Sequence, residues 1–312
     1  MTGGVERVEG GAGRAIGRQT DRVPTGIVLM IGTVFLFAAM DTVVKYLSQH
    51  YPVLQIVWAR YAFHMLFMLP VLVRLGPRRL LTTGRPGLQV LRAFLLLATT
   101  LLFFTAIRFI PLAQASAIGF VGPLLVTAMS ALLLKERVGP RRWTAVLVGF
   151  IGVLVIIRPG FGMVHWAASL PLFMAVCFAV YQIVTRILTR TEDASTTLFW
   201  TGGIAALAMS AIVPLAWTQP DAAGWALLAC VGLLGALSHW LMIKAYERAP
   251  ASILAPYNYT NLFWTIPIGF VVFGDVPDVW MLSGAAIVIA CGLYVWWRER
   301  QLARIAAASA PS

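Results

Sequence analysis

Charged residues are scarce in this sequence, and their scarcity excludes a soluble protein. Only 12% of the 312 residues are Asp, Glu, Lys or Arg, whereas a soluble domain carries about 25%. Acidic residues are the scarcer kind: the sequence has 12 Asp and Glu and 24 Lys and Arg, which gives a net charge of +12. In a membrane chain this basic excess orients helices against the bilayer and its anionic lipid. We therefore infer a lipid bilayer as partner and no nucleic acid.

Cysteine and histidine are also few, and neither is arranged as a catalytic or metal site. Cys177, Cys230 and Cys291 lie in apolar segments without a second Cys or a His at ligand spacing. We expect no disulfide, no metal and no cofactor. Metalloprotease, serine-hydrolase and nucleotide-binding P-loop motifs are absent, so an intramembrane enzyme is a weak alternative. A channel is another, but it would show rings of like residues or a filter loop.

Long apolar runs dominate the rest of the chain, since 60% of the residues are hydrophobic. A membrane-spanning helix needs about 20 apolar residues, and ten segments meet this requirement. The predicted helices span residues 24–47, 52–75, 86–109, 112–135, 140–158, 164–188, 195–217, 221–247, 250–274 and 276–297. The sequence therefore predicts an all-α integral membrane protein with ten transmembrane helices.

Basic residues and the chain ends set the predicted orientation. Lys and Arg concentrate in every second connection, and only Arg108 and Arg158 stand out on the opposite side. Because positive residues stay in the cytoplasm, both termini are predicted to be cytoplasmic. Residues 1–23 have no continuous apolar run, so we expect a disordered tail rather than a signal peptide. Residues 298–312 are expected to form a second tail, disordered from Leu302 onward.

The last part of the chain repeats the rhythm of an earlier part. Segments 106–158 and 245–297 share the order of helix, acidic turn and small-residue helix, and Pro111 falls on Pro250. The predicted units are residues 24–158 and 164–297. Because each unit has five helices, the second crosses the membrane in the opposite sense, as in the inverted repeats of secondary transporters. Those proteins bind substrate near the midplane and expose it alternately to each side.

Ionisable side chains inside predicted spans need a reason, because each is unfavourable in lipid unless it is paired or hydrated. Asp41 and Lys45 lie one turn apart on the first helix, and Arg60 and His64 have the same spacing on the second. In a structural interpretation, Asp41 bridges Lys45 and Arg60. In a functional one, Lys45 and Arg60 bind an anionic group, and Asp41 or His64 takes up a coupling proton. Both interpretations stay open.

Three other charged residues are predicted to have structural roles. Arg92, near the start of the third helix, is expected to extend to the cytoplasmic surface. Glu136 and Asp275 align in the repeat at helix ends. There each carboxylate is expected to cap the following helix or to pair with a neighbouring Arg.

Polar and aromatic side chains gather on the fourth, sixth and ninth predicted helices. The fourth carries Gln114 and a Pro123 that is able to bend it, and the sixth carries Tyr181. The ninth carries Tyr257, Asn258, Asn261 and Trp264. Any one of these side chains could simply form an interhelical hydrogen bond, but their concentration predicts a substrate cavity. Aromatic faces, amides and a cation suit a planar, zwitterionic or anionic small metabolite.

Four motifs, in order, carry a family resemblance. They are FAAMDTVVKYL, PVLQIVWARYAF, PLAQASAIGFVGPL, and LLLKERV followed by WTAVLVGFIGVLVI. Together with the duplication, they make residues 24–297 similar to the ten-helix EamA-type members of the drug/metabolite transporter superfamily. The resemblance implies two inverted five-helix EamA repeats and a carrier of small organic metabolites in a bacterial-type inner membrane.

The first two motifs also bear on the substrate. The MD-xxxK pattern, followed by YPVLQ and WAR, resembles the branch that contains riboflavin and S-adenosylmethionine carriers. Amino-acid or drug exporters of the same superfamily are the alternative. Many members have a small polar residue at the position of Asp41. Whether Asp41 contacts the substrate, binds a proton or only pairs with Lys45 therefore stays open. The direction of transport, the coupling ion and the choice between monomer and homodimer stay open as well.

Overall fold

Long helices form the whole of the described structure. The computed structural model describes residues 23–133, 139–158, 165–188 and 191–308, and every regular element in these ranges is helical. The first half contains α2 (Val23–Leu47), α3 (Val53–Leu75), α4 (Pro77–Leu81), α5 (Pro86–Phe109), α6 (Leu112–Gly119), α7 (Gly122–Leu133) and α8 (Pro140–Ile157). The second half contains η1 (Trp166–Ser169), α9 (Leu170–Leu188), α10 (Ala194–Ile212), η2 (Val213–Ala216), α11 (Ala222–Tyr246), α12 (Ala251–Leu254), η3 (Ala255–Thr260), α13 (Asn261–Phe273) and α14 (Val279–Ala308).

Nine stretches of the described chain are helical, long and apolar enough to cross a membrane, which confirms the integral membrane class. They coincide with nine of the ten predicted spans. The exception is the predicted span 250–274, which is divided into α12, η3 and α13. At 13 residues, α13 is roughly 20 Å long, which is less than the ~30 Å of a bilayer core.

The two spans that align in the repeat, the fourth and the ninth, are both interrupted. The fourth divides into α6 and α7 at Phe120 and Val121, just before Pro123. The ninth is predicted as one helix, and this prediction is wrong, because η3 is a 3-10 segment with Pro256 near its start. Proline has no N–H, so it cannot bond to the carbonyl one turn earlier. One helical hydrogen bond is therefore missing next to each break.

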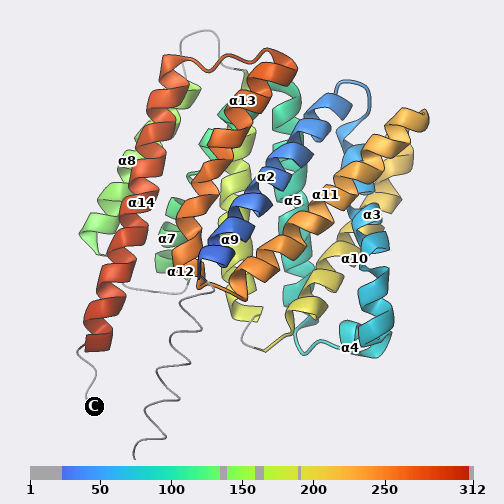
Figure 1. Ribbon diagram of the computed structural model, residues 1–312, viewed down its shortest axis with the longest axis horizontal. Helices are drawn as coiled ribbons and strands as arrows, with labels where there is room; N and C mark the ends of the chain where they lie inside the picture. The colour runs from blue at the N-terminus through green and yellow to red at the C-terminus, as the bar shows by residue number, and fades with distance from the viewer. Residues whose placement is uncertain (1–22, 134–138, 159–164, 189–190, 309–312) are drawn as a thin grey trace, which may run out of the picture.

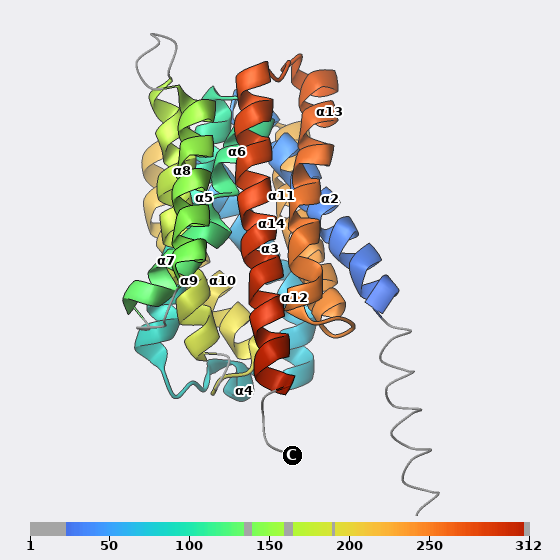
Figure 2. The same cartoon turned by 90° about the vertical axis from the view of Figure 1, so that its left-hand side faces the viewer.

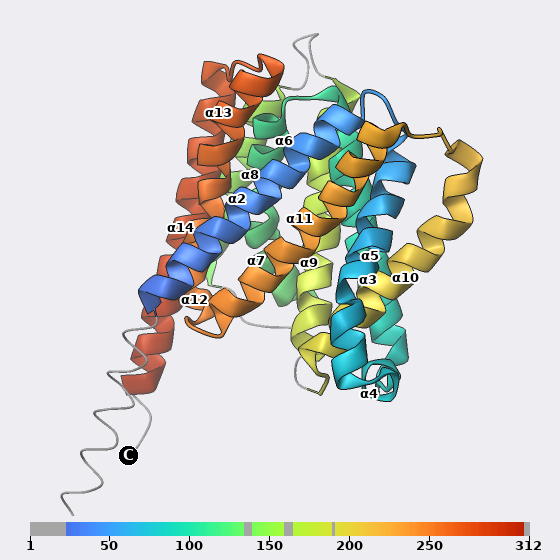
Figure 3. The ribbon, with the colours of Figure 1, turned by 45° about the vertical axis from the view of Figure 1, so that its right-hand side comes forward.

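Helix pairing follows an inverted repeat (Figures 1 and 3). α2 packs along α11, and α5 packs along α9. These two pairs are equivalent, because exchanging the halves puts α2 in the place of α9 and α5 in the place of α11. α8 packs along α14 (Figure 2). α6 packs against α13, so equivalent helices meet each other directly. The pairing agrees with the predicted fold class of two inverted halves.

Glycine allows the α8–α14 pair to approach closely. A Cβ atom on Gly152 would lie 2.9 Å from Ile287 and Val288 and 3.0 Å from the carbonyl oxygen of Gly284. Small residues bring backbones together in this way in membrane helices. By contrast, a Cβ on Gly203 would meet nothing within 4 Å, so Gly203 is not needed for a close helix contact.

The two ends of the bundle differ in what they carry. We name the end near Val23 and Ala308 the termini end, and the opposite end, with the α13–α14 turn, the far end (Figure 1). α14 continues to Ala308, so the disorder predicted from Leu302 is wrong for this helix, whose last turns are rich in Ala and other good helix formers. The N-terminal tail, residues 309–312 and the expected cap at Glu136 lie outside the described residues.

Candidate functional site

The two helix interruptions meet at the interface of the halves. Phe120 lies nine residues after Pro111, and Tyr259 lies nine residues after Pro250, so they are equivalent in the repeat. Their rings are in edge-to-face contact, with centroids 5.1 Å apart. Pro123 also leaves the Gly119 carbonyl without its usual helical donor. Interrupted helices in equivalent positions are where inverted-repeat transporters hold their substrates, so this interface is the centre of the candidate site.

Lys45 connects the two halves at the far end. Its Nζ lies 2.5 Å from Oδ2 of Asp275, in the turn between α13 and α14. It also donates to the carbonyl of Ile110 at 3.4 Å and lies 4.7 Å from the ring centre of Phe273. The predicted bridge from Asp41 to Lys45 is therefore wrong. Lys45 stands near the end of α2, where its long side chain reaches the neighbouring turn, while Asp41 lies one turn deeper.

A second ion pair fastens the same turn. Arg158 at the end of α8 pairs with Asp278, which also accepts the backbone N–H of Met281 at 2.7 Å and so begins α14. Arg158 has a positive φ of 51°, which ends α8 in the left-handed conformation. The turn of residues 274–278 in the second half is thus held by two cations of the first half.

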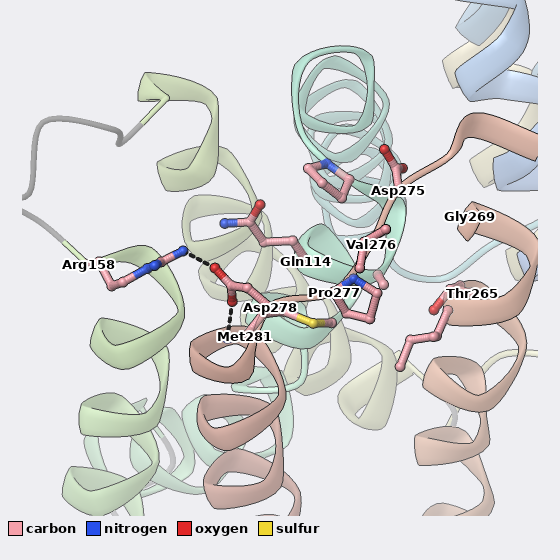
Figure 4. A pocket seen from close by; sticks show the side chains of 12 residues that line it. Gln114, Arg158, Thr265, Gly269, Asp275, Val276, Pro277, Asp278 and Met281 are labelled. Atoms are coloured by element: carbon pink, nitrogen blue, oxygen red, sulfur yellow. Dashed lines mark hydrogen bonds and ion pairs between the residues drawn. The ribbon is translucent and has the colours of Figure 1, made fainter.

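A small pocket lies beneath this turn, between α6 and α13 (Figure 4). We name it the far-end pocket, and its volume is about 90 Å³. Polar groups line it, namely Gln114, Arg158, Thr265, Asp275 and Asp278. Sequence reasoning predicted Gln114 but missed Thr265, because one Thr in an apolar helix carries no pattern.

Arg60 forms the core of an interior group. Its Nη1 donates to Thr100 Oγ1 at 2.8 Å, and its guanidinium lies 5.4 Å from the ring centres of Tyr61 and Phe104. Asp41 is buried nearby, within the electrostatic influence of Arg60. Within the described chain Asp41 forms no hydrogen bond or ion pair, so the predicted Asp41–Arg60 bridge is also wrong as a direct contact. The interaction between them is through space.

His64, on the same helix as Arg60, faces a second histidine. The ring centres of His64 and His239 are 6.0 Å apart, and Phe37 of α2 contacts His239 from another side at 5.3 Å. His239 Nδ1 is buried and has no hydrogen-bond partner among the described residues. The two half-buried imidazoles therefore lie close together between α2, α3 and α11.

Arg92 is buried, so the predicted extension to the surface is wrong. The side chain is 5% exposed and donates to Thr185 Oγ1 at 2.8 Å, to Tyr181 at 2.6 Å and to Thr201. The ring centre of Tyr181 lies 4.6 Å from the guanidinium. We name these four residues the Arg92 cluster. It joins α5 of the first half to α9 and α10 of the second, and among the described residues its acceptors are hydroxyl and carbonyl oxygens without a carboxylate.

The predicted residues of the ninth helix do not gather around one cavity. Tyr257 packs with the small cluster around Met30, and exposed Asn258 donates to the carbonyl of Ala255 in its own segment. Asn261 begins α13 and is half-buried. Trp264 contacts Phe35 with ring centres 5.1 Å apart. Its Nε1 is buried and has no partner in the described chain. Their substrate contacts stay predictions.

Inverted halves, interrupted equivalent helices and buried cations between the halves define a multi-pass membrane transporter. The model of the EamA-like transporter family matches residues 24–158 and again residues 165–297. The chain belongs to this family. A solved crystal structure with 15% identity superposes with a TM-score of 0.61 over 89% of this chain and 99% of that one, which supports the fold.

Curated relatives are named for several substrates. The chain is 30% identical to the riboflavin transporter of Vibrio cholerae, over 89% of this chain and 95% of the relative. It is 26% identical to the S-adenosylmethionine uptake transporter of Rickettsia conorii, over 89% and 94%. The pseudopaline exporter of Pseudomonas aeruginosa is 28% identical, over 87% and 96%. These names point to a small-molecule transporter rather than an enzyme.

Proposed function

We propose that this chain is a secondary transporter that moves a small, cofactor-like metabolite, such as riboflavin or S-adenosylmethionine, across the inner membrane by alternating access. The observation that carries the proposal is the contact between the two interrupted spans at the interface of the inverted halves. Such interruptions free backbone groups for a substrate. The relatives named for riboflavin and S-adenosylmethionine support this choice of substrate class.

Each predicted residue has a place in this proposal. Lys45 and Gln114 act at the far end, while Arg60 and Tyr181 present a cation and an aromatic ring in the interior. Further substrate contacts are proposed for Tyr257, Asn258, Asn261 and Trp264. Asp41 or His64 takes up a coupling proton. Both termini are proposed to be cytoplasmic, which places the far end on the outer side of the membrane.

Export is the second candidate. It is favoured by the 28% identity to a pseudopaline exporter over nearly the same length. An importer and an exporter of this family would share the inverted halves, so the fold does not separate them. The direction of transport is determined by comparing substrate accumulation in right-side-out and inside-out vesicles under the same ion gradient.

Uptake into proteoliposomes tests the proposal. We expect saturable accumulation of riboflavin or S-adenosylmethionine, with counterflow when unlabelled substrate is loaded inside. Arg60→Ala should reduce the rate about 100-fold, because the interior loses its cation. Arg78→Ala, at an exposed arginine of α4, is the matched control and should transport normally.

One result would count against the carrier function, and another against the role of Arg60. Flux that rises linearly with concentration and shows no counterflow would indicate a channel. Normal transport by Arg60→Ala would remove Arg60 from the site and leave the carrier function standing.

A further inference from the structure

Two ion pairs frame the far-end pocket, and together they carry no net charge. Asp275 and Asp278 line the pocket from the second half, and their partners, Lys45 and Arg158, belong to the first half. Their side chains are partly withdrawn from water, from 9% exposed for Lys45 to 43% for Asp278. A charge withdrawn from water is unfavourable without its partner. The turn 274–278 can therefore leave the first half only if other charges replace both partners.

One polar atom of the pocket lacks a partner. The side chain of Thr265 is fully buried, and no described residue bonds to its Oγ1. Thr33, another buried threonine, donates to the carbonyl one turn earlier in α2. Figure 4 shows Thr265 across the pocket from Gln114 and Asp278. Since buried hydroxyls are almost always hydrogen-bonded, Thr265 indicates that the pocket receives a polar group.

The size of the pocket limits what that group can be. A cavity needs roughly 10–15 Å³ of comparable volume for one water molecule, so about 90 Å³ admits a group of several heavy atoms. A carboxylate, an ammonium and the carbon between them have this size. The pocket therefore suits the polar head of a metabolite rather than the whole molecule.

We propose that the far-end pocket binds the zwitterionic α-amino-carboxylate head of the substrate, an inference that rests on the proposed transport function. The ligand carboxylate pairs with one of the two cations, and its ammonium pairs with one of the two aspartates. Thr265 and Gln114 supply hydrogen bonds that hold the head in place. Because a zwitterion carries one charge of each sign, it replaces both partners of one ion pair, so that one of the two ion pairs that hold the turn 274–278 opens. An uncharged ligand cannot do this.

This pocket chemistry separates the two proposed substrates. S-adenosylmethionine carries an α-amino-carboxylate, and riboflavin carries none. The far-end pocket therefore favours S-adenosylmethionine or another metabolite with an amino-acid head as the substrate. Riboflavin could then bind only elsewhere in the interior.

Ligand binding to the purified full-length protein tests the inference by isothermal titration calorimetry. The probes are S-adenosylmethionine, L-methionine, and two methionine analogues that lack either the amino group or the carboxylate. Wild type should bind the two zwitterions, and each analogue should bind at least about tenfold more weakly. Thr265→Val and Gln114→Leu should each weaken the binding of the zwitterions about tenfold. The control Thr33→Val removes a buried hydroxyl outside the pocket and should bind as wild type does.

The outcomes separate the pocket from the transport function. Equal affinity for zwitterions in wild type and in both pocket variants, with all proteins eluting as folded species, would overturn the inference. Absence of zwitterion binding to wild type would overturn it as well, even if riboflavin is transported. Zwitterion binding that depends on Thr265, in a protein that shows no transport, would sustain the pocket and contradict the proposed function instead.

Discussion

Two side-chain connections join the halves, the Lys45–Asp275 ion pair at the far end and the Arg92 cluster. They differ in the groups that pair with the buried cation. At the far end, Lys45 pairs with a carboxylate, that of Asp275. In the Arg92 cluster, nearer the termini end of α5, the acceptors that the described residues offer the guanidinium are neutral hydroxyl and carbonyl oxygens. An ion pair leaves two unpaired charges when it opens, whereas hydroxyls can return to bonds within their own helices. We therefore expect the far-end connection to be the more sensitive to charge and the Arg92 cluster to be the easier to open.

Loss of the far-end ion pair should have the largest effect. Lys45→Ala should lower transport about 100-fold and stability by only about 1–2 kcal/mol, because Asp275 remains partly exposed. Uptake and thermal unfolding of the same preparation measure both quantities. The exchange of charges, Lys45→Asp with Asp275→Lys, should restore much of the stability. Full transport by Lys45→Ala would mean that the ion pair is not part of the cycle.

Removal of the cation from the Arg92 cluster should have a smaller effect. Arg92→Met should lower transport about tenfold with little change in stability, because Thr185 and Thr201 keep their bonds to carbonyls of their own helices. Uptake assays and urea unfolding test this. A loss of stability larger than that of Lys45→Ala would reverse the comparison between the two connections.

Proton coupling would add a pH dependence to both connections. If Asp41 or His64 takes up a proton from the outer side, uptake by wild type should rise severalfold as the external pH falls. Asp41→Asn or His64→Gln should flatten the profile, because the substituted side chain no longer titrates. Proteoliposomes with a fixed internal pH measure this. A profile that is unchanged in both variants would assign coupling to other groups or to exchange.

The smallest effects are expected for Trp264 and Asn258 of the ninth span, which belong to neither connection. Trp264→Ala should change the ratio of uptake rates between riboflavin and S-adenosylmethionine about threefold, because an aromatic face is lost beside Phe35. Competition assays measure this ratio. Asn258→Ala, at an exposed amide bonded within its own segment, should change it less. A change confined to thermal stability would assign Trp264 to packing alone.

Hydropathy made most of the fold predictable. Nine of the spans follow directly from runs of apolar residues, because a bilayer imposes length and composition on any helix that crosses it. Pro123 indicated a bend in the fourth span, but the interruption of the ninth span and the 3-10 geometry of η3 were not predicted. Hydropathy alone underestimated α14, where Ala-rich sequence continues the helix past the span.

The candidate site was less predictable, because it depends on contacts between distant parts of the chain. Lys45 and Asp275 are 230 residues apart, and the nearer Asp41 was the natural partner by spacing. Arg92 stands six residues into its helix, a position typical of a side chain that extends to the surface. Only the packing of α9 and α10 against α5 surrounds it with hydroxyls.

The distance across each end of the bundle tests the account most directly. Spin labels at His50 and Val276 report on the far end, and labels at Arg78 and Glu247 report on the termini end; all four positions are exposed. Cys177, Cys230 and Cys291 would first be replaced. In lipid, substrate should lengthen one distance and shorten the other, and Lys45→Ala should lengthen the far-end distance without substrate. Identical distance distributions in all these conditions, from a protein that still transports, would contradict alternating access governed by the far-end ion pair.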